Sequence, residues 1–362
     1  MKTKLLAFYL PQYYPTPYND EWWQPGFTEW TNVAKAKPLF RGHYQPKIPK
    51  DLGFYDLRVS ETREKQAALA KEYGIDGFCY WHYWFAGRRL LEIPFQEVVE
   101  SGKPDFPFCL CWANHSWYKK MWNPDVKKKE DILLIEQTYP GKQDYINHFN
   151  SLLPAFKDHR YIKDDDGRLL FSIYAGWNFV DTELFFKTWN DLAKENGLKG
   201  FRFISYAMHP EDDKKALAKG FDCVTHDFVT MRPNGISYLK RKWKNFLIKY
   251  FKKPFLYDYN DYIQVIKEQC VADEHHYPCV IPNFDHSSRS SSYGTIYGNA
   301  TPEKWEEVLK IALNKENKNE KNRFVFIKAW NEWGEGNYLE PDLKFGRGWL
   351  EAVKNAIASA GK

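Results

Sequence analysis

The sequence contains no long apolar run. No hydrophobic stretch approaches the ~20 residues that a membrane-spanning helix requires. The first apolar segment is interrupted by Pro11, and no small-residue cleavage site of the kind found in secretory signals follows it. We therefore interpret this segment as a first β-strand and expect a cytoplasmic protein, with peripheral contact to a membrane as an open alternative.

The cysteines form no CxxC pair, which excludes the usual zinc and redox spacings. The absence of a disulfide framework agrees with a reducing compartment. Four of the six cysteines fall inside apolar, strand-like runs, where we expect them to be small buried hydrophobic residues. The six positions are Cys79, Cys109, Cys111, Cys223, Cys270 and Cys279.

Familiar nucleotide and hydrolase motifs are also missing. Neither GxGxxG nor GxxxxGK follows a strand-like run, and no GxSxG turn occurs. A nucleotide-sugar donor bound in another way stays open. The net charge of +5 is too small to indicate a nucleic-acid partner. His82, His226 and Asp285 have no recognised metal spacing, so we expect no metal and no cofactor.

The feature present in excess is aromatic side chains, which make up 18% of the 362 residues. Eight short apolar runs alternate with segments of helical spacing, which is typical of a parallel sheet. Because eight such strands close a cylinder, the prediction is an α/β protein with a single (β/α)8 barrel and elaborated loops. The predicted strands are 5–10, 75–81, 106–112, 169–174, 201–206, 222–228, 278–284 and 324–330.

Helices are predicted at 61–73, 183–195, 301–314 and 349–359. No linker or repeat divides the chain, so residues 1–362 are predicted to form one catalytic barrel domain. The connection from Pro11 to Arg58 is longer than ordinary loops, and loops of that length are usually functional.

Active sites of such barrels lie at the carboxyl ends of the strands, where this sequence places aromatic, amide, imidazole and carboxylate side chains. Aromatic faces stack on sugar rings and polar groups bind sugar hydroxyls, so the pattern favours a glycan ligand. The predicted substrate-binding residues are Tyr9, Gln12, Trp30, His82, Trp84, Trp112, Asn114, Asp285, Asn331 and Trp333.

The segment KAWNEWGEGNYLEP, residues 328–341, concentrates acids at the end of the eighth predicted strand. Glycosidic bond chemistry requires two carboxyl groups, and Glu332 and Glu335 could both face the barrel mouth. The structural alternative is that one of them caps the last helix or pairs with Arg347.

Residues 238–254 contain seven Lys and Arg residues, interleaved with aromatic and aliphatic residues, and no acid. We interpret them as a basic amphipathic insertion that contacts an anionic membrane or an acidic glycan. A helix whose lysines are merely solvated is the structural alternative.

Several motifs identify a family. FYLPQYYP (8–15), GFTEWTNV (26–33), GIDGFCYWHYWF (74–85) and AWNEWGEGNYLEPD (329–342) resemble the WbsX family of bacterial polysaccharide-biosynthesis proteins. That family is similar to the glycoside hydrolase family 99 endo-α-mannosidases, and the resemblance covers nearly the whole chain. It implies a (β/α)8 barrel whose Asn-Glu-Trp-x-Glu motif supplies Glu332 and Glu335.

The resemblance also implies roles for the two acids. Glu332 would deprotonate a sugar 2-hydroxyl, which then attacks the anomeric carbon, and Glu335 would protonate the leaving oxygen. On that assignment Glu335 should have a raised pKa and Glu332 should stay ionised. Two departures alter sugar contacts: His115 stands where the family has an acid, and Phe284 to Ser287 replace a Trp-Asp-Asn-Thr pattern.

Three functions follow from these observations. The first is a glycoside hydrolase-like enzyme acting on α-linked sugars. The second is glycosyl transfer during O-antigen, lipopolysaccharide or capsule assembly. The third is a glycan-binding barrel without catalysis.

Overall fold

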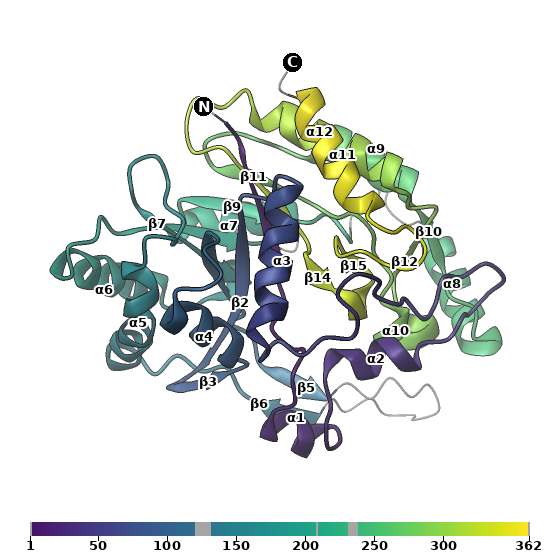
Figure 1. Ribbon diagram of the computed structural model, residues 1–362, viewed down its shortest axis with the longest axis horizontal. Helices are drawn as coiled ribbons and strands as arrows, with labels where there is room; N and C mark the ends of the chain where they lie inside the picture. Colours follow the sequence, from purple (N-terminus) through teal and green to yellow (C-terminus); the bar gives the residue numbers. More distant parts are fainter. Residues whose placement is uncertain (1, 120–131, 208, 231–237, 361–362) are drawn as a thin grey trace.

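The computed structural model describes residues 2–119, 132–207, 209–230 and 238–360. Eight parallel strands pair in the order β1, β13, β11, β9, β8, β7, β4, β2, and β2 pairs back onto β1, which closes the barrel. Figure 1 shows the helices around this cylinder. The strands are β1 Lys4–Tyr9, β2 Gly77–Phe85, β4 Phe108–Trp112, β7 Leu169–Tyr174, β8 Phe201–Tyr206, β9 Cys223–His226, β11 His276–Val280 and β13 Phe324–Ile327.

The (β/α)8 prediction is therefore confirmed, and each of the eight strands overlaps its predicted run. Eight helices follow the eight strands in turn and cover the cylinder: α3 Ser60–Glu72, α4 Ile93–Ser101, α5 Lys142–Lys157, α6 Thr182–Glu195, α7 Pro210–Ala218, α9 Tyr259–Gln269, α11 Pro302–Glu316 and α12 Gly348–Ala360. The start of α11 illustrates the local cause, because the Thr301 hydroxyl accepts the Lys304 amide and Pro302 occupies the first turn.

The remaining elements belong to the connections. The additional helices are α1 Pro17–Trp22, α2 Glu29–Lys35, α8 Tyr238–Phe251 and α10 Ser287–Ser290, with 3-10 turns η1 Gly176–Asn178, η2 Ser291–Tyr293 and η3 Trp333–Glu335. The additional strands are β3 Arg88–Leu90, β5 Trp117–Lys119, β6 Ile132–Ile135, β10 Leu256–Asp258, β12 Ile296–Gly298, β14 Asn331–Glu332 and β15 Asn337–Tyr338.

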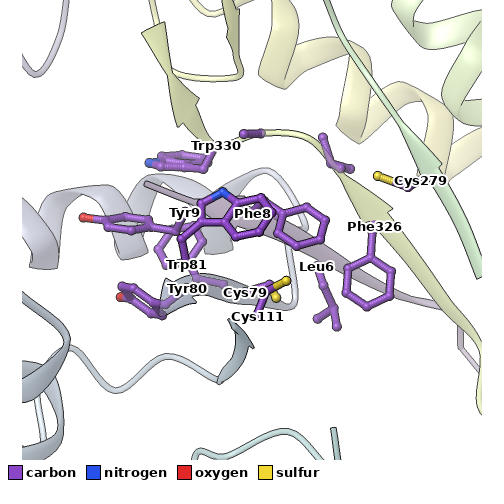
Figure 2. Close-up of a cluster of buried hydrophobic side chains, with 14 of the residues drawn as sticks. Leu6, Phe8, Tyr9, Cys79, Tyr80, Trp81, Cys111, Cys279, Phe326 and Trp330 are labelled. Carbon is purple, nitrogen blue, oxygen red and sulfur yellow. The ribbon is translucent and has the colours of Figure 1, made fainter. Parts of the chain in front are cut away.

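Aromatic rings, rather than only branched aliphatics, fill the barrel (Figure 2). The Phe8 ring lies 5.0 Å from Trp81, 5.5 Å from Phe326 and 5.4 Å from Tyr206, centroid to centroid. Much of the aromatic excess therefore serves packing. The six cysteines are buried and unpaired, which confirms the prediction for the four in strand-like runs.

Within the described ranges, no helix combines the length and hydropathy needed to span a bilayer.

Candidate active site

A cavity of about 960 Å³ lies at the carboxyl end of the barrel. Its walls carry the aromatic side chains Trp81, Tyr83, Trp117 and Tyr174, and its polar lining includes both Glu332 and Glu335. The volume falls within the range of small-molecule sites and is large enough for several sugar rings. Both glutamates line the same cavity, as the sequence predicted.

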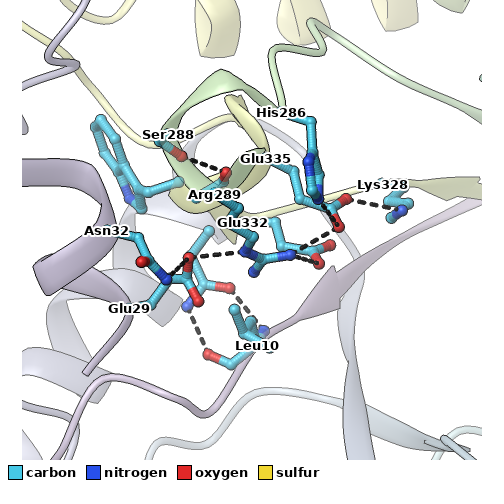
Figure 3. A network of polar contacts seen from close by, with 12 residues as sticks. Leu10, Glu29, Asn32, His286, Ser288, Arg289, Lys328, Glu332 and Glu335 are labelled. Atoms are coloured by element: carbon cyan, nitrogen blue, oxygen red, sulfur yellow. Dashed lines mark hydrogen bonds and ion pairs between the residues drawn. The ribbon is translucent and has the colours of Figure 1, made fainter. Parts of the chain in front are cut away.

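Both acids come from one short hairpin. Glu332 ends β14, Glu335 ends the η3 turn, and β15 pairs antiparallel with β14 to close the hairpin. The Asn331 amide accepts a hydrogen bond from Leu10 N at 2.7 Å and donates to Leu10 O at 3.0 Å. This paired contact fixes the hairpin to the end of β1, so both carboxyls are held at the mouth (Figure 3).

Glu335 lies between two cations. Arg289 Nη1 is 2.7 Å from Oε1, and Lys328 Nζ is 3.1 Å from Oε2. Burial alone would raise the pKa of Glu335, but Lys328 and Arg289 outweigh it and lower that pKa to about 2, with His286 assisting. Glu335 is therefore a stable carboxylate.

Glu332 has the opposite environment. Its Oε2 is buried without a hydrogen-bond partner, and its Oε1 lies 3.9 Å from Arg289 Nη1. Burial, and then the negative charge of Glu335, raise the pKa of Glu332 to about 7. The expectation of a raised pKa at Glu335 and an ionised Glu332 is thus wrong, because Lys328 and Arg289 both contact Glu335 closely.

Arg289 is positioned by a third acid. Its Nε contacts Glu29 Oε1 at 2.8 Å, and Glu29, at the start of α2, is buried and also lines the cavity. Gly334 permits this approach, since a Cβ there would lie 1.6 Å from Glu29 Oε1. Figure 3 shows Arg289 extending from Glu29 towards both catalytic candidates.

Asp285, predicted to bind substrate, instead supports the hairpin from behind. Its carboxylate accepts from Gln45 at 2.8 Å and lies 2.9 Å from His43 and 3.6 Å from Lys47. Burial would raise its pKa, but Lys47 and His43 hold it below the usual range. The Asp285 backbone N–H donates to the Glu335 carbonyl at 2.6 Å, so this buried network sets the position of the η3 turn.

On β2 the structure separates residues that the sequence grouped together. Trp81 and Tyr83 line the cavity, whereas His82 and Trp84 point to the other face and contact α5. His82 Nε2 lies 2.8 Å from His148 Nε2, and the Trp84 ring stacks on His148. The reason is the two-residue period of a strand, which sends neighbours to opposite faces.

Other predicted binding residues are also enclosed by protein. Tyr9 donates to Gln66, Trp30 to the Tyr55 carbonyl, Trp112 to the Trp84 carbonyl and Trp333 to Glu340. With Asn331, all are buried and none lines the cavity. Gln12 and Asn114 do line it, so direct sugar contact stays a prediction for these two.

One part of the structural alternative for the acidic segment, the pairing with Arg347, is contradicted. Arg347 pairs with Asp51 at 2.7 Å and lies 3.6 Å from Glu72, and neither Glu332 nor Glu335 contacts it. For metals, the described ranges contain no cluster of three His, Cys, Asp or Glu side chains arranged to hold an ion.

Sequence reasoning missed Glu29 and Lys328 as site residues. The available signal for Glu29 was its place in the long 11–58 connection, which also supplies Gln12 and Asn32 to the cavity. Lys328 falls inside the eighth predicted run, where a lone lysine among apolar residues was the signal. His115 lines the cavity, with its ring 5.0 Å from that of Tyr174.

A (β/α)8 barrel whose mouth presents two glutamates in an aromatic-walled cavity defines a carbohydrate-active enzyme class. Comparison with known proteins agrees. The family model described as Glycosyltransferase WbsX matches residues 5–353, and the chain belongs to that family.

Among curated proteins, WxcX of Xanthomonas campestris pv. campestris strain B100 is 34% identical over 360 residues, covering 98% of this chain and 50% of WxcX. A second strain has an equally similar WxcX. This chain thus spans about half the length of the curated relatives that it matches.

Among solved structures, a glycoside hydrolase-like protein superimposes with a TM-score of 0.62 at 12% identity, covering 98% of this chain and 94% of the other. The GH99 endo-alpha-mannosidase from Bacteroides thetaiotaomicron gives 0.55 at 13% identity, with 100% and 98% coverage. These likenesses establish a shared fold.

Proposed function

We propose that this chain cleaves or transfers sugars at an α-glycosidic bond of a polysaccharide or oligosaccharide, with Glu332 and Glu335 as the catalytic pair. The observation that carries the proposal is that the two acids line one cavity in opposite electrostatic settings, with two cations on Glu335 and an unpartnered, buried Oε2 on Glu332. Burial raises the pKa of Glu332 to about 7, so this carboxyl can carry a proton near neutral pH, whereas Lys328 and Arg289 keep Glu335 ionised. Glycosidic chemistry needs one acid and one base, and this pair supplies both.

The reaction balances with one proton on the pair. The carboxylate takes the proton of the sugar 2-hydroxyl, and that oxygen bonds to the anomeric carbon as the glycosidic bond breaks. The protonated carboxyl gives its proton to the leaving oxygen. Water or an acceptor hydroxyl then opens the 1,2-anhydro sugar. The α linkage and the 2-hydroxyl step are taken from the resemblance to family 99 enzymes.

The order of the two roles is testable. The unliganded charges favour Glu332 as proton donor, whereas the resemblance assigns that role to Glu335. A glycosyl fluoride needs little leaving-group protonation, so the variant that lacks the acid should retain turnover of the fluoride. Glu332→Gln retaining it would support the assignment by charge, and Glu335→Gln retaining it would support the assignment by resemblance.

The primary experiment is a digestion screen of α-linked oligosaccharides and O-polysaccharides with products identified by mass spectrometry. Each Gln variant should lose roughly 100- to 10,000-fold in kcat on the natural linkage while circular dichroism at the assay temperature shows that it is folded. Exposed Glu351 of α12 provides the matched control, and Glu351→Gln should keep full activity. Full turnover by both site variants would refute the pair.

Glycosyl transfer in O-antigen, lipopolysaccharide or capsule assembly is the second candidate, favoured by the family description. It predicts turnover only with a nucleotide-sugar or lipid-linked donor and none with oligosaccharide and water. Binding of a glycan without turnover of any donor would leave the third function, a binding barrel.

A further inference from the structure

Helix α8 presents a row of exposed aromatic side chains. Trp243, Phe246 and Tyr250 are 58%, 42% and 63% exposed, although large aromatic residues are usually covered. They are three and four positions apart, so they share one face of the helix. The Phe246 centroid lies 5.5 Å from Trp243 and 5.1 Å from Tyr250, which makes the row continuous.

The same helix is attached to the protein by its other side. Ile248 is only 5% exposed and lies across the helix from Phe246. The covered position of α8 is therefore on the side away from the aromatic row. Phe251, 58% exposed with its ring 5.8 Å from Phe246, extends the row at the end of the helix.

The segment around this row is strongly basic. Residues 238–254 contain seven Lys and Arg and no Asp or Glu. Lys242, Lys252 and Lys253 are exposed, whereas the side chains at 238–241, 244, 245 and 249 lie outside the described residues. Aromatic side chains flanked by lysines on a surface helix are the composition that inserts into the headgroup region of an anionic bilayer.

The position of α8 relates it to the cavity. Strand β9 ends at His226 and α9 begins at Tyr259, so α8 is an insertion in the connection that leaves the carboxyl end of β9. In a (β/α)8 barrel that end carries the active site. Figure 1 shows α8 at the edge of the molecule, outside the ring of strands.

We propose that the aromatic row of α8 and its flanking lysines dock this protein on an anionic lipid bilayer, with the barrel mouth directed to the membrane. An acidic polymer fits this surface less well than a bilayer. The described residues of α8 line neither the candidate active-site cavity nor the second cavity, and they expose bulky apolar rings. Docking in this orientation places the cavity beside the bilayer. Together with the proposed function, on which this step rests, it makes the substrate a glycan attached to a lipid.

Vesicle flotation tests the docking. The probes are phosphatidylcholine vesicles with and without phosphatidylglycerol. The protein should float with the anionic vesicles only, and added salt should weaken binding. Trp243→Ser with Phe246→Ser should lower partitioning at least about tenfold, and so should Lys242→Glu with Lys252→Glu and Lys253→Glu.

Matched controls come from the opposite end of the barrel. Lys318 and Lys321 are exposed just before β13 begins, and Val271, 50% exposed, lies before β11. Reversing both lysines to Glu, or replacing Val271 with Ser, should leave flotation within about twofold of wild type. These variants make the same kinds of change as the α8 variants, charge reversal and loss of an exposed apolar side chain, at another location.

Equal flotation with neutral and anionic vesicles, or no effect of either α8 variant, would overturn docking. Brominated lipid quenches the fluorescence of tryptophans that enter the bilayer, so equal quenching of proteins with and without Trp243 would overturn it as well. If the quenching is equal, release of the protein from the vesicles by an acidic polysaccharide would identify an acidic polymer as the partner of α8. Flotation requires no turnover, so Glu335→Gln should float like wild type. A failed docking test therefore leaves the proposed catalysis standing, and the reverse is equally true.

Discussion

Replacing Lys328 with methionine tests whether this lysine sets the pKa values of the proposed catalytic pair, Glu332 and Glu335. Methionine is close in length to lysine and removes the charge from a largely buried side chain, which is 14% exposed. Lys328 Nζ lies 3.1 Å from Glu335 Oε2 and 3.4 Å from Asp227 Oδ2. Without Lys328, Glu335 loses one of its two cations. The negative charge of Asp227, which Lys328 also contacts, then repels the Glu335 carboxylate more strongly.

The size of the effect follows from the contact distance. A unit charge pair at 3.1 Å is worth about 5 kcal/mol at an effective dielectric constant of ~20, which corresponds to about four pKa units. Arg289 remains and water enters the vacated space, so we expect a rise of at least about one unit in the pKa of Glu335. The pKa of Glu332 rises as well, because Lys328 also lowers it.

The sign of the pH dependence can be worked out for the singly protonated pair. Wild-type kcat/KM should fall as pH rises through about 7, where Glu332 loses its proton, and should show no acid limb until near pH 2. In Lys328→Met both limbs should move to higher pH. This result is the same whichever glutamate is the acid, because the limbs report the pair.

The assay is kcat/KM against pH on a cleaved glycan, with circular dichroism at each pH to confirm folding. Lys321→Met, at the other end of the barrel, is the control and should reproduce the wild-type profile. An unmoved alkaline limb in Lys328→Met would refute the argument, as would a shift of either limb to lower pH.

Two further predictions concern stability and geometry. Burial raises the pKa of Glu316 from 4.5 to about 8, so between these pH values the unfolded chain releases a proton that the folded state keeps, and the folded state loses stability as pH rises through that window. Glu316→Gln should therefore raise the thermal midpoint clearly at pH 8 and much less at pH 5, and equal midpoints of variant and wild type at pH 8 would contradict this. Gly334→Ala places a methyl group against Glu29 and should detach it from Arg289, lowering kcat at least about tenfold with little change in KM, whereas unchanged kcat would show that this pair is dispensable.

The fold was predictable because its signal repeats. Each barrel strand is a short apolar run followed by a helical period, and eight such runs fix the cylinder. The boundaries were less predictable: β2 extends to Phe85 instead of ending at residue 81, because it continues beyond the barrel to pair with β3. At β11 the strand ends at Val280, and the remaining apolar residues form the loop that leads to Asp285.

The site was predictable only in part. The local acid motif located Glu332 and Glu335, since both lie on one hairpin. The position of a strand end does not determine which side chains face the cavity. His82 and Trp84 were therefore predicted to bind substrate, whereas their neighbours Trp81 and Tyr83 line the cavity. The long connection 11–58 was identified as functional by its length, yet its contacts to residues far along the chain depend on tertiary packing.

The charge difference between the two glutamates is a tertiary property for the same reason. In the ion-pair network of the described residues, four carboxyl groups surround two permanent cations; these are Glu29, Asp227, Glu332 and Glu335 around Arg289 and Lys328. An excess of acid in a buried site favours retention of a proton, and it favours the carboxyl whose contact to the two cations is the longest, which is 3.9 Å for Glu332 against 2.8 Å for Glu29 and 3.4 Å for Asp227. That carboxyl is Glu332, because the η3 turn directs Glu335 between Arg289 and Lys328.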